Sequence, residues 1–242
     1  MAAPGGMPGT GPADDGLAGD GGALDIVIPS LNARATLAST LAAVAGTGQV
    51  IIADGGSSDG TASLARASGA LVVEAARGRG QQLAVGAAAG SAPWILFLHA
   101  DTRPQPGWLG AVERFQRDPA NRARAGYFRL RFDSARPEAR RVERMAAWRC
   151  RALGLPYGDQ GLLIARSFYE ELGGHRPLPL MEDVDLARRI GAGRLVALDA
   201  DALTSPARYE RDGWWLRPAR NLALLSLWYA GLPPRIIRRL YG

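Results

Sequence analysis

The stretch Trp94-Ile-Leu-Phe-Leu-His99-Ala-Asp101-Thr102 passes from an apolar run to polar side chains within a few residues. A short continuous apolar run, with Gly, Ser and Pro before it and Arg-Pro after it, predicts a buried strand of a parallel sheet. In open α/β sheets the ligand crevice lies at the carboxyl ends of the strands. His99 and Asp101 are therefore predicted to project into such a crevice.

A carboxylate at this place suits Mg²⁺ or Mn²⁺, which prefer oxygen ligands and share their coordination shell with substrate phosphates. The alternative is that Asp101 only opens the next turn, because Asp-Thr before Arg-Pro is also a favourable turn sequence. This stretch alone does not separate the two interpretations, and the rest of the chain has to decide between them.

The composition indicates a globular protein with one large domain, or one domain with a small appendage. The chain has 242 residues, of which 47% are hydrophobic and 21% charged. The formal net charge is +6, which suits anionic partners such as nucleotide phosphates or acidic lipids. All basic residues are Arg, which indicates a coding bias, and no recognised nucleic-acid-binding motif accompanies the charge. We therefore predict no nucleic-acid partner.

Cellular location is predicted from features that the sequence lacks. No apolar run approaches the roughly 20 residues of a membrane-spanning helix. Residues 1–22 have neither the basic start nor the apolar core of a secretory signal and are predicted to be a disordered leader. A single Cys150 excludes a disulfide within the chain. A cytoplasmic protein is expected.

Strands and helices are predicted to alternate through the first hundred residues. This alternation is typical of a parallel α/β sheet. The strands are expected at 24–29, 50–54, 70–74 and 94–101. The helices are expected at 36–44, in a segment that ends at 68, and in an Ala-rich segment that follows 77–82 and ends at 90. Further along, we expect helices at 108–115, 137–153, 167–172, 181–189 and 221–230, a half-exposed strand at 125–132 and a last strand at 194–198.

Polar residues or glycines follow all four of the early strands. Four such strand ends together are harder to explain as ordinary turns than any single strand end is. Asp54, next to a glycine turn, can accept a hydrogen bond from a base or a ribose; the alternative is a simple turn before a helix. Arg77 and Arg79 offer forked donors to a phosphate; the alternative is an exposed basic loop. The predicted nucleotide-binding residues are Pro29, Ser30, Asn32, Asp54, Gly55, Arg77, Arg79, Gln81, Ala100 and Asp101.

These motifs in this order resemble the inverting, nucleotide-sugar-dependent glycosyltransferases of family 2, which have the GT-A fold. The resemblance extends over about 24–198. Residues 28–32 (I-P-S-L-N) and 54–61 (D-G-G-S-S-D-G-T) are similar to the first two motifs of the family, and His99-Ala-Asp101 stands at the place of its D-x-D. Glu182-Asp183 matches the later E-D. L-H-A-D-T and G-D-Q-G are similar to a compact bacterial subgroup.

The resemblance implies a role for each matched residue. Asp54 would bind the nucleotide base, with uridine as the default, and Asp101 would bind the cation on the diphosphate. Asp183 would be the catalytic base, and Glu182 would either orient Asp183 or touch the acceptor. His99 replaces the first Asp of D-x-D; an imidazole can bind Mn²⁺ but suits it less well than oxygen does. The implied reaction is a single inverting displacement with Mn²⁺ or Mg²⁺. The implied metal ligands are Asp101 and His99, and the acceptor is expected beside Asp159, Gln160 and Gly161.

We therefore expect an α/β fold of GT-A type: a Rossmann-like, mostly parallel sheet flanked by helices, in one domain with a helical tail. The domain is expected at 23–200, with a nucleotide-binding half at 23–103 and an acceptor half at 104–200. The tail at 201–242 combines Trp, an apolar helix and Arg beside Ile and Leu. It either lies on an anionic membrane at the cytoplasmic face, near a lipid-linked acceptor, or packs on the domain's own core.

Three other functions compete with that of a transferase. A dinucleotide-dependent oxidoreductase should have G-x-G-x-x-G after its first strand, where this chain has Pro-Ser-Leu-Asn. A sugar-phosphate nucleotidyltransferase should have a basic glycine-rich loop directly after its first strand, and this sequence lacks such a loop at that place. The remaining alternative is a protein that binds nucleotides or acidic surfaces without transferase activity, a reading that the missing first Asp of D-x-D favours.

Overall fold

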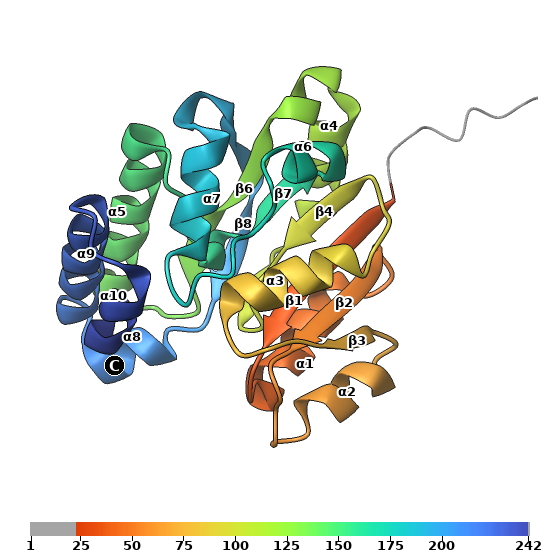
Figure 1. Cartoon of the computed structure of the whole chain (residues 1–242), viewed down its shortest axis with the longest axis horizontal. Coiled ribbons are helices and arrows are strands. Elements are labelled where there is room, and N and C mark those ends of the chain that lie inside the picture. The colour runs from red at the N-terminus through yellow and green to blue at the C-terminus, as the bar shows by residue number, and fades with distance from the viewer. Residues whose placement is uncertain (1–22, 242) are drawn as a thin grey trace, which may run out of the picture.

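The computed structural model describes residues 23–241, so the predicted leader at 1–22 lies outside the described part of the chain. Eight strands form one mixed sheet in the order β3-β2-β1-β4-β7-β6-β8-β5, with helices on both faces (Figure 1). Four of the seven strand pairings are parallel and three are antiparallel. The predicted fold class, a mostly parallel α/β sheet with helices at the C-terminal end, is confirmed.

The parallel half contains β1 (Leu24–Ser30), β2 (Gln49–Asp54), β3 (Leu71–Glu74) and β4 (Trp94–Phe97). The helices α1 (Arg34–Val44) and α2 (Thr61–Ala67) pack against each other, and α3 (Arg79–Ala88) crosses β1 and β2 in front of the sheet in Figure 1. Every residue of β1 is buried because the strand lies between two neighbours and under helices.

The antiparallel pairings begin where β4 meets β7 (Leu162–Ala165). Next to β7 lies β6 (Ala125–Phe132), which runs parallel to β8 (Leu195–Thr204), and β5 (Thr102–Pro104) closes the edge on β8. The predicted strand 94–101 therefore ends at Phe97, and His99 and Asp101 lie in the turn between β4 and β5. The predicted last strand, 194–198, continues to Thr204 because its second half pairs with both β6 and β5.

The expected half-exposed character of 125–132 holds for the second half of β6, where Arg129 is exposed and Arg131 half-buried between buried apolar residues. The first half differs, since all of 125–128 is buried. On the apolar side of the strand, Trp108 packs edge-on against Phe128, and Trp214 packs edge-on against Phe132. The expected alternation is therefore confirmed for 128–132 only.

The remaining helices surround this second half of the sheet. None of the helices within residues 23–241 is both long and apolar enough to cross a bilayer. They are α4 (Trp108–Arg117), α5 (Pro137–Leu153), α6 (Arg166–Glu171), α7 (Glu182–Ile190), α8 (Ala207–Asp212), α9 (Leu216–Tyr229) and α10 (Pro234–Tyr241), with single 3-10 turns η1 (Pro119–Ala123), η2 (Gly158–Gln160) and η3 (Ala192–Arg194).

The C-terminal helices α8, α9 and α10 lie with α5 at one end of the molecule (Figure 1). The tail packs on the domain through Leu225, which lies in a buried cluster with Leu155, Val184 and Ala187. This is one of the two interpretations of the tail. Membrane contact concerns the apolar side chains of the tail that remain exposed, Leu222 and Leu240 among them, and it stays a prediction.

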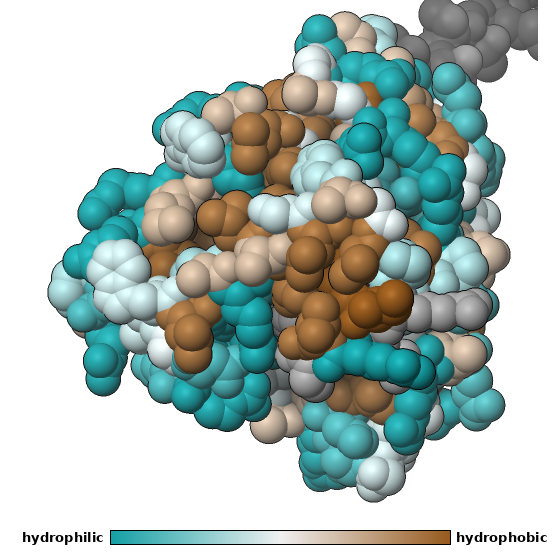
Figure 2. Space-filling view, turned by 60° about the vertical axis from the view of Figure 1, so that its left-hand side comes forward, coloured by the Kyte–Doolittle hydropathy of each residue, from teal (hydrophilic) through white to brown (hydrophobic). Residues whose placement is uncertain are grey.

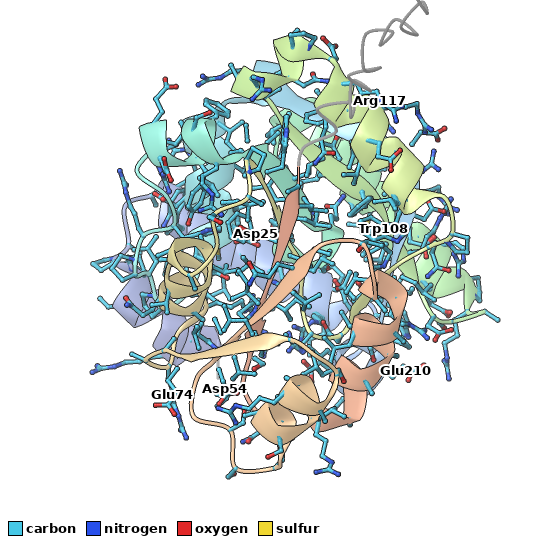
Figure 3. The ribbon with its side chains drawn as sticks, turned by 90° about the vertical axis from the view of Figure 1, so that its right-hand side faces the viewer. Asp25, Asp54, Glu74, Trp108, Arg117 and Glu210 are labelled. Carbon is cyan, nitrogen blue, oxygen red and sulfur yellow. The ribbon has the colours of Figure 1, made fainter. Side chains whose placement is uncertain are left out.

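A buried ion pair connects the two halves of the sheet. Asp25, at the start of β1 (Figure 3), accepts hydrogen bonds from Arg166 Nη2 at 2.7 Å and from the backbone N–H of Ala92 at 2.8 Å. The same guanidinium donates to the carbonyls of Ala87 and Ala92. A side chain at Gly90 would place its Cβ 2.1 Å from Asp25 Oδ2, so glycine is required there.

We predict that Asp25→Asn lowers the free energy of unfolding by about 3 kcal/mol, because it leaves the charge of Arg166 buried without its carboxylate. Urea denaturation followed by circular dichroism measures this. Asp133→Asn is the control, since Asp133 pairs with Arg103 at the surface and is 61% exposed, and its loss should cost less than about 1 kcal/mol. Equal effects of the two substitutions would contradict the prediction.

Candidate active site

Two adjoining hollows lie beside the turn that follows β4. The outer cleft, of about 500 Å³, is lined by the end of β1, the start of α3 and part of α8. The inner pocket, of about 110 Å³, lies between α7, η2 and α8. The residues that line both are Arg79, His99, Asp101, Ser205 and Arg208.

The turn that carries His99, Ala100 and Asp101 is fixed at both ends. The backbone N–H of Thr102 donates to the carbonyl of His99 at 3.1 Å. The hydroxyls of Thr102 and Thr204 are hydrogen-bonded at 3.0 Å, which holds β5 on β8. This pairing therefore sets the position of Asp101 at the boundary of the two hollows.

Asp54, at the carboxyl end of β2 (Figure 3), organises the wall of the outer cleft but does not line it. Its carboxylate accepts from the Ser30 hydroxyl at 2.9 Å and from the backbone N–H and hydroxyl of Ser57 at 2.8 and 2.5 Å. Burial raises the pKa of Asp54, but the hydrogen bonds from Ser57, Ser30 and Gly56 outweigh burial and lower that pKa overall. Gly55 joins the wall by donating its N–H to the carbonyl of Ser30.

Residues at the end of β1 and in the turns after β1 and β4 line the outer cleft together, as expected if the carboxyl ends of the strands meet at one edge of the sheet. They are Pro29, Ser30, Asn32 and Ala100. Asn32 has φ 50°, a left-handed conformation that asparagine tolerates better than most residues. In this conformation the side-chain Oδ1 of Asn32 accepts a hydrogen bond from the backbone N–H of Ser58 at 2.9 Å. The backbone N–H of Asn32 donates to Ser57 Oγ, also at 2.9 Å. The loops after β1 and β2 are thereby joined.

The arginine loop contributes one of its two arginines. Arg79 lines both hollows, and its Nη1 lies 3.3 Å from Glu182 Oε1. Arg77 is exposed and lines neither hollow, and Gln81 lines neither as well. The neighbouring Gln82 was missed: it is buried and donates Nε2 to the carbonyls of Ser30 and Ala53. Gln82 lies four residues before Gly86, so the two residues share the buried face of α3. That spacing is the signal by which Gln82 could have been predicted to face the sheet.

Four carboxyl groups line the inner pocket: Asp101, Asp159, Glu182 and Asp183. Glu182 and Asp183 begin α7 after Met181, whose φ of 66° is unusual for a residue with a long side chain. Such strain is concentrated at functional sites. The carboxylate of Asp183 accepts the N–H of Gly158 at 3.0 Å and of Val184 at 2.8 Å, which fixes its orientation.

The protonation of this pocket departs from ordinary values. Burial, together with the nearby Asp183 and Asp101, raises the pKa of Asp159 to about 6 although Arg149 and Arg79 oppose this. Burial and Asp183 raise the pKa of Glu182 to about 7, so its ion pair with Arg79 offsets only part of the cost. Burial, Arg79 and Arg208 lower the pKa of His99 well below its usual range, which keeps the imidazole neutral.

Asp159 is the member of the predicted acceptor segment that lines the inner pocket. The residue is partly exposed as a whole, but its Oδ1 is buried and has no hydrogen-bond partner. Gln160 points inward and donates to the carbonyl of Phe128, and Gly161 lies against Leu98 and Phe128. Gly158 is needed for a close approach, because a Cβ there would lie 2.3 Å from His99 Nε2.

The site fits a divalent cation that shares its ligands with a phosphate. Among residues 23–241, no three His, Cys, Asp or Glu side chains are arranged to hold a metal by themselves. Asp101 and the neutral His99 at the boundary of the two hollows can supply the few protein ligands that Mg²⁺ or Mn²⁺ needs when substrate phosphates and water supply the rest. The surplus of carboxylates around them favours a cation in that place.

Sequence reasoning also missed the residues that close the site from the C-terminal side. Tyr157, Ser205, Arg208, Tyr209 and Asn221 line the inner pocket. Most of them come from the segment after β8, which no motif marks. They reach the site because α8 and α9 form part of the wall of the inner pocket.

Comparison with known proteins shows the same fold. A family model described as glycosyl transferase family 2 matches residues 25–170. Glucosyl-3-phosphoglycerate synthase from Mycobacterium tuberculosis, solved with Mn²⁺, UDP and glucosyl-3-phosphoglycerate, is 21% identical with a TM-score of 0.52, over 76% of this chain and 71% of that one. No protein of curated function matches the sequence.

Two further solved structures extend the comparison. A mannosyltransferase from Pyrobaculum calidifontis in complex with GDP-Man and Mn²⁺ is 19% identical with a TM-score of 0.62, over 83% of this chain and 62% of that one. Mannosyl-3-phosphoglycerate synthase from Rubrobacter xylanophilus is 18% identical with a TM-score of 0.53, over 76% and 66%. This chain therefore spans just under two thirds of the length of both proteins.

We predict that Asp159→Asn stabilises the metal-free protein at pH 7.5 by about 2 kcal/mol. Because the pKa of Asp159 is raised to about 6, its ionisation costs the folded state free energy. The cost is absent below the unfolded pKa, grows as pH rises from about 4 to 6, and is complete above 6. The gain should therefore be less than half as large at pH 4.

Urea denaturation in EDTA at both pH values measures this difference. Asp199→Asn, at a site whose side chain is 81% exposed, is the matched control and should show no such pH dependence. A variant at Asp159 that is less stable than the wild type at pH 7.5 would contradict the assignment.

Proposed function

Because the chain belongs to glycosyl transferase family 2, we propose that it moves a sugar from a nucleoside diphosphate donor to an acceptor hydroxyl, with a divalent cation and inversion at the anomeric carbon. The observation that carries this proposal is the boundary shared by the two hollows. Arg79, His99 and Asp101 line both, so a diphosphate bound there would have its nucleoside on one side and its sugar on the other.

The outer cleft suits the nucleoside diphosphate. It lies at the carboxyl ends of the parallel strands, where α/β folds bind nucleotides, and Arg79 and Arg208 bring positive charge to it. Uridine is the default base, and the Mycobacterium tuberculosis relative is solved with UDP, whereas the Pyrobaculum calidifontis relative is solved with GDP-Man. The base is therefore the first property to measure.

Asp101 and His99 would hold Mn²⁺ or Mg²⁺. When bound, the cation neutralises the charge that develops on the departing diphosphate. The low pKa of His99 supports this assignment, because only a neutral imidazole has a lone pair for a metal. Arg79 and Arg208 would stabilise the same negative charge from the protein side.

Asp183 would act as the general base. Its carboxylate is held by the N–H groups of Gly158 and Val184, which leaves it oriented in the inner pocket. It takes the proton of the acceptor hydroxyl while the oxygen bonds to the anomeric carbon, and the bond from that carbon to the diphosphate breaks with its electron pair. Glu182, held by Arg79, positions the first turn of α7 and hence Asp183.

We predict cation-dependent binding of one nucleotide, with UDP and GDP compared by calorimetry with and without Mn²⁺. Asp101→Asn should weaken binding in Mn²⁺ at least about tenfold, or about 1.4 kcal/mol, because the amide binds a divalent cation less well than a carboxylate. Asp133→Asn, away from the site, should bind as the wild type does. A nucleotide affinity that changes neither on removal of Mn²⁺ nor in Asp101→Asn would refute the cation site.

We predict that Asp183→Asn keeps nucleotide binding but slows transfer by about 10²- to 10⁴-fold, because only the proton acceptor is lost. Release of nucleoside diphosphate from the matching nucleotide sugar, with water as the acceptor, measures the rate. Asp199→Asn should react as the wild type does. An unchanged rate in the Asp183 variant would contradict the assignment of Asp183 as the base. Nucleotide binding that Asp183→Asn leaves unaffected, without turnover in the wild type, would favour a nucleotide-binding protein without transferase activity.

A further inference from the structure

An apolar groove runs along the C-terminal side of the molecule between α5 and α9. Its volume is about 560 Å³, within the range of roughly 300 to 1,000 Å³ that is usual for small-molecule sites. Apolar side chains from the two helices face it and remain largely exposed: Trp148 is 59%, Trp215 64% and Leu222 61% accessible. Figure 2 turns this side of the molecule forward and shows broad hydrophobic areas on it. Contiguous exposed apolar surface of this kind marks a binding site.

The groove continues into the inner pocket. Tyr157, Asp159, Tyr209 and Asn221 line both. The groove is lined mainly by apolar side chains, although Glu138, Arg141 and Arg144 of α5 also line it. Its shared end is polar and lies beside Asp183. A ligand that follows the groove would therefore place its polar end next to the proposed catalytic base.

The polar end favours a neutral hydroxyl over a phosphate. Asp159 Oδ1 is buried there without a hydrogen-bond partner, and a hydroxyl is the group that can donate to it. A phosphate would have to approach the carboxyl groups of Asp159 and Asp183. Arg149 at this end donates to Leu155 O and Gln160 Oε1 and stacks on Tyr157, and Arg217 pairs with Asp212. Arg79 and Arg208 also line the inner pocket, where the proposed function assigns them to the diphosphate of the donor.

The walls of the groove are anchored independently of any ligand. Glu143 of α5 accepts the backbone N–H of Phe132 at 2.8 Å and pairs with Arg131 and Arg140. Arg217 of α9 pairs with Asp212 at 2.5 Å. The exposed apolar side chains thus stand on two fixed helices.

We propose that this groove binds the acceptor and that the acceptor is a long-chain apolar alcohol. This inference rests on the proposed transferase function and names its acceptor class. The hydrocarbon chain of this alcohol lies between α5 and α9, and the hydroxyl of the alcohol lies between Asp159 and Asp183. In the reaction, the hydroxyl oxygen bonds to the anomeric carbon, its proton passes to Asp183, and the nucleoside diphosphate leaves with the electron pair of the broken bond.

The first test measures alcohol binding without any nucleotide. Trp148 and Trp215 line the groove, so their fluorescence reports on an occupant. Titration with straight-chain alcohols from hexanol to dodecanol, and with farnesol, should give affinities that rise with chain length. Leu222→Arg should weaken farnesol binding at least tenfold. Leu240→Arg is the matched control on α10. Leu240 is 54% exposed, close to the 61% of Leu222, and lies outside the groove, so this variant should bind as the wild type does.

The second test uses the nucleotide sugar that binds. Wild type and Leu240→Arg should transfer sugar to farnesol, whereas Leu222→Arg should lose this transfer and keep the hydrolysis of the donor by water. Affinity independent of chain length, or equal effects of the two arginine substitutions, would overturn the groove assignment. A protein that is dimeric by light scattering and becomes monomeric in Leu222→Arg would overturn it in favour of a second copy of the chain. Failure of nucleotides to bind would count against the transferase alone, since alcohol binding is measured without them.

Discussion

The ion pair between Asp25 and Arg166 determines how the two halves of the sheet meet. Asp25 belongs to β1, the centre of the parallel half, and Arg166 follows β7, the strand that first runs the other way. The guanidinium also holds the carbonyls of Ala87 and Ala92, at the end of α3 and before β4. Both charges are largely removed from water, so neither can be relieved by solvent if the halves separate. The antiparallel strands are therefore fixed against the parallel ones at the opposite end from the site.

That attachment has a consequence for the chemistry. With β4 fixed between β1 and β7, the turn after Phe97 must cross the top of the sheet, and β5 then pairs with β8 at the far edge. His99 and Asp101 are carried on this crossing, between elements from both halves. The carboxyl groups of α7 and the guanidinium of Arg79 meet them there. A site assembled from both halves in this way brings the proposed donor and acceptor residues around one point.

The sequence predicted the parallel half and the strand-end residues because their signals are local. An apolar run followed by Asn, Asp or Gly identifies both a strand and its polar end. Ser30, Asn32, His99 and Asp101 line the hollows for this reason. What the sequence did not predict depends on packing between distant segments: the complete burial of the first half of β6, the extension of β8 along two partners, and the inward direction of Gln82 and Gln160. Asp54 is the intermediate case, since its position was predicted but its hydrogen bonds to Ser30 and Ser57 direct it into the wall.

The tail shows that core packing and contact with an apolar environment, which were opposed in the expectation of either core packing or membrane contact, do not exclude each other. Composition shows only that α9 is apolar, and it does not show how many sides of the helix are. In the structure α9 uses two sides, with Leu225 packed on Leu155 and Val184 and Leu222 left exposed beside α5. A helix that is apolar on more than one side must find a second cover or expose hydrophobic surface to water at a cost of about 25 cal/mol per Å². Because that second side faces a groove that opens onto Asp159 and Asp183, the cost of leaving it uncovered is most simply offset when a ligand of the reaction itself fills the groove.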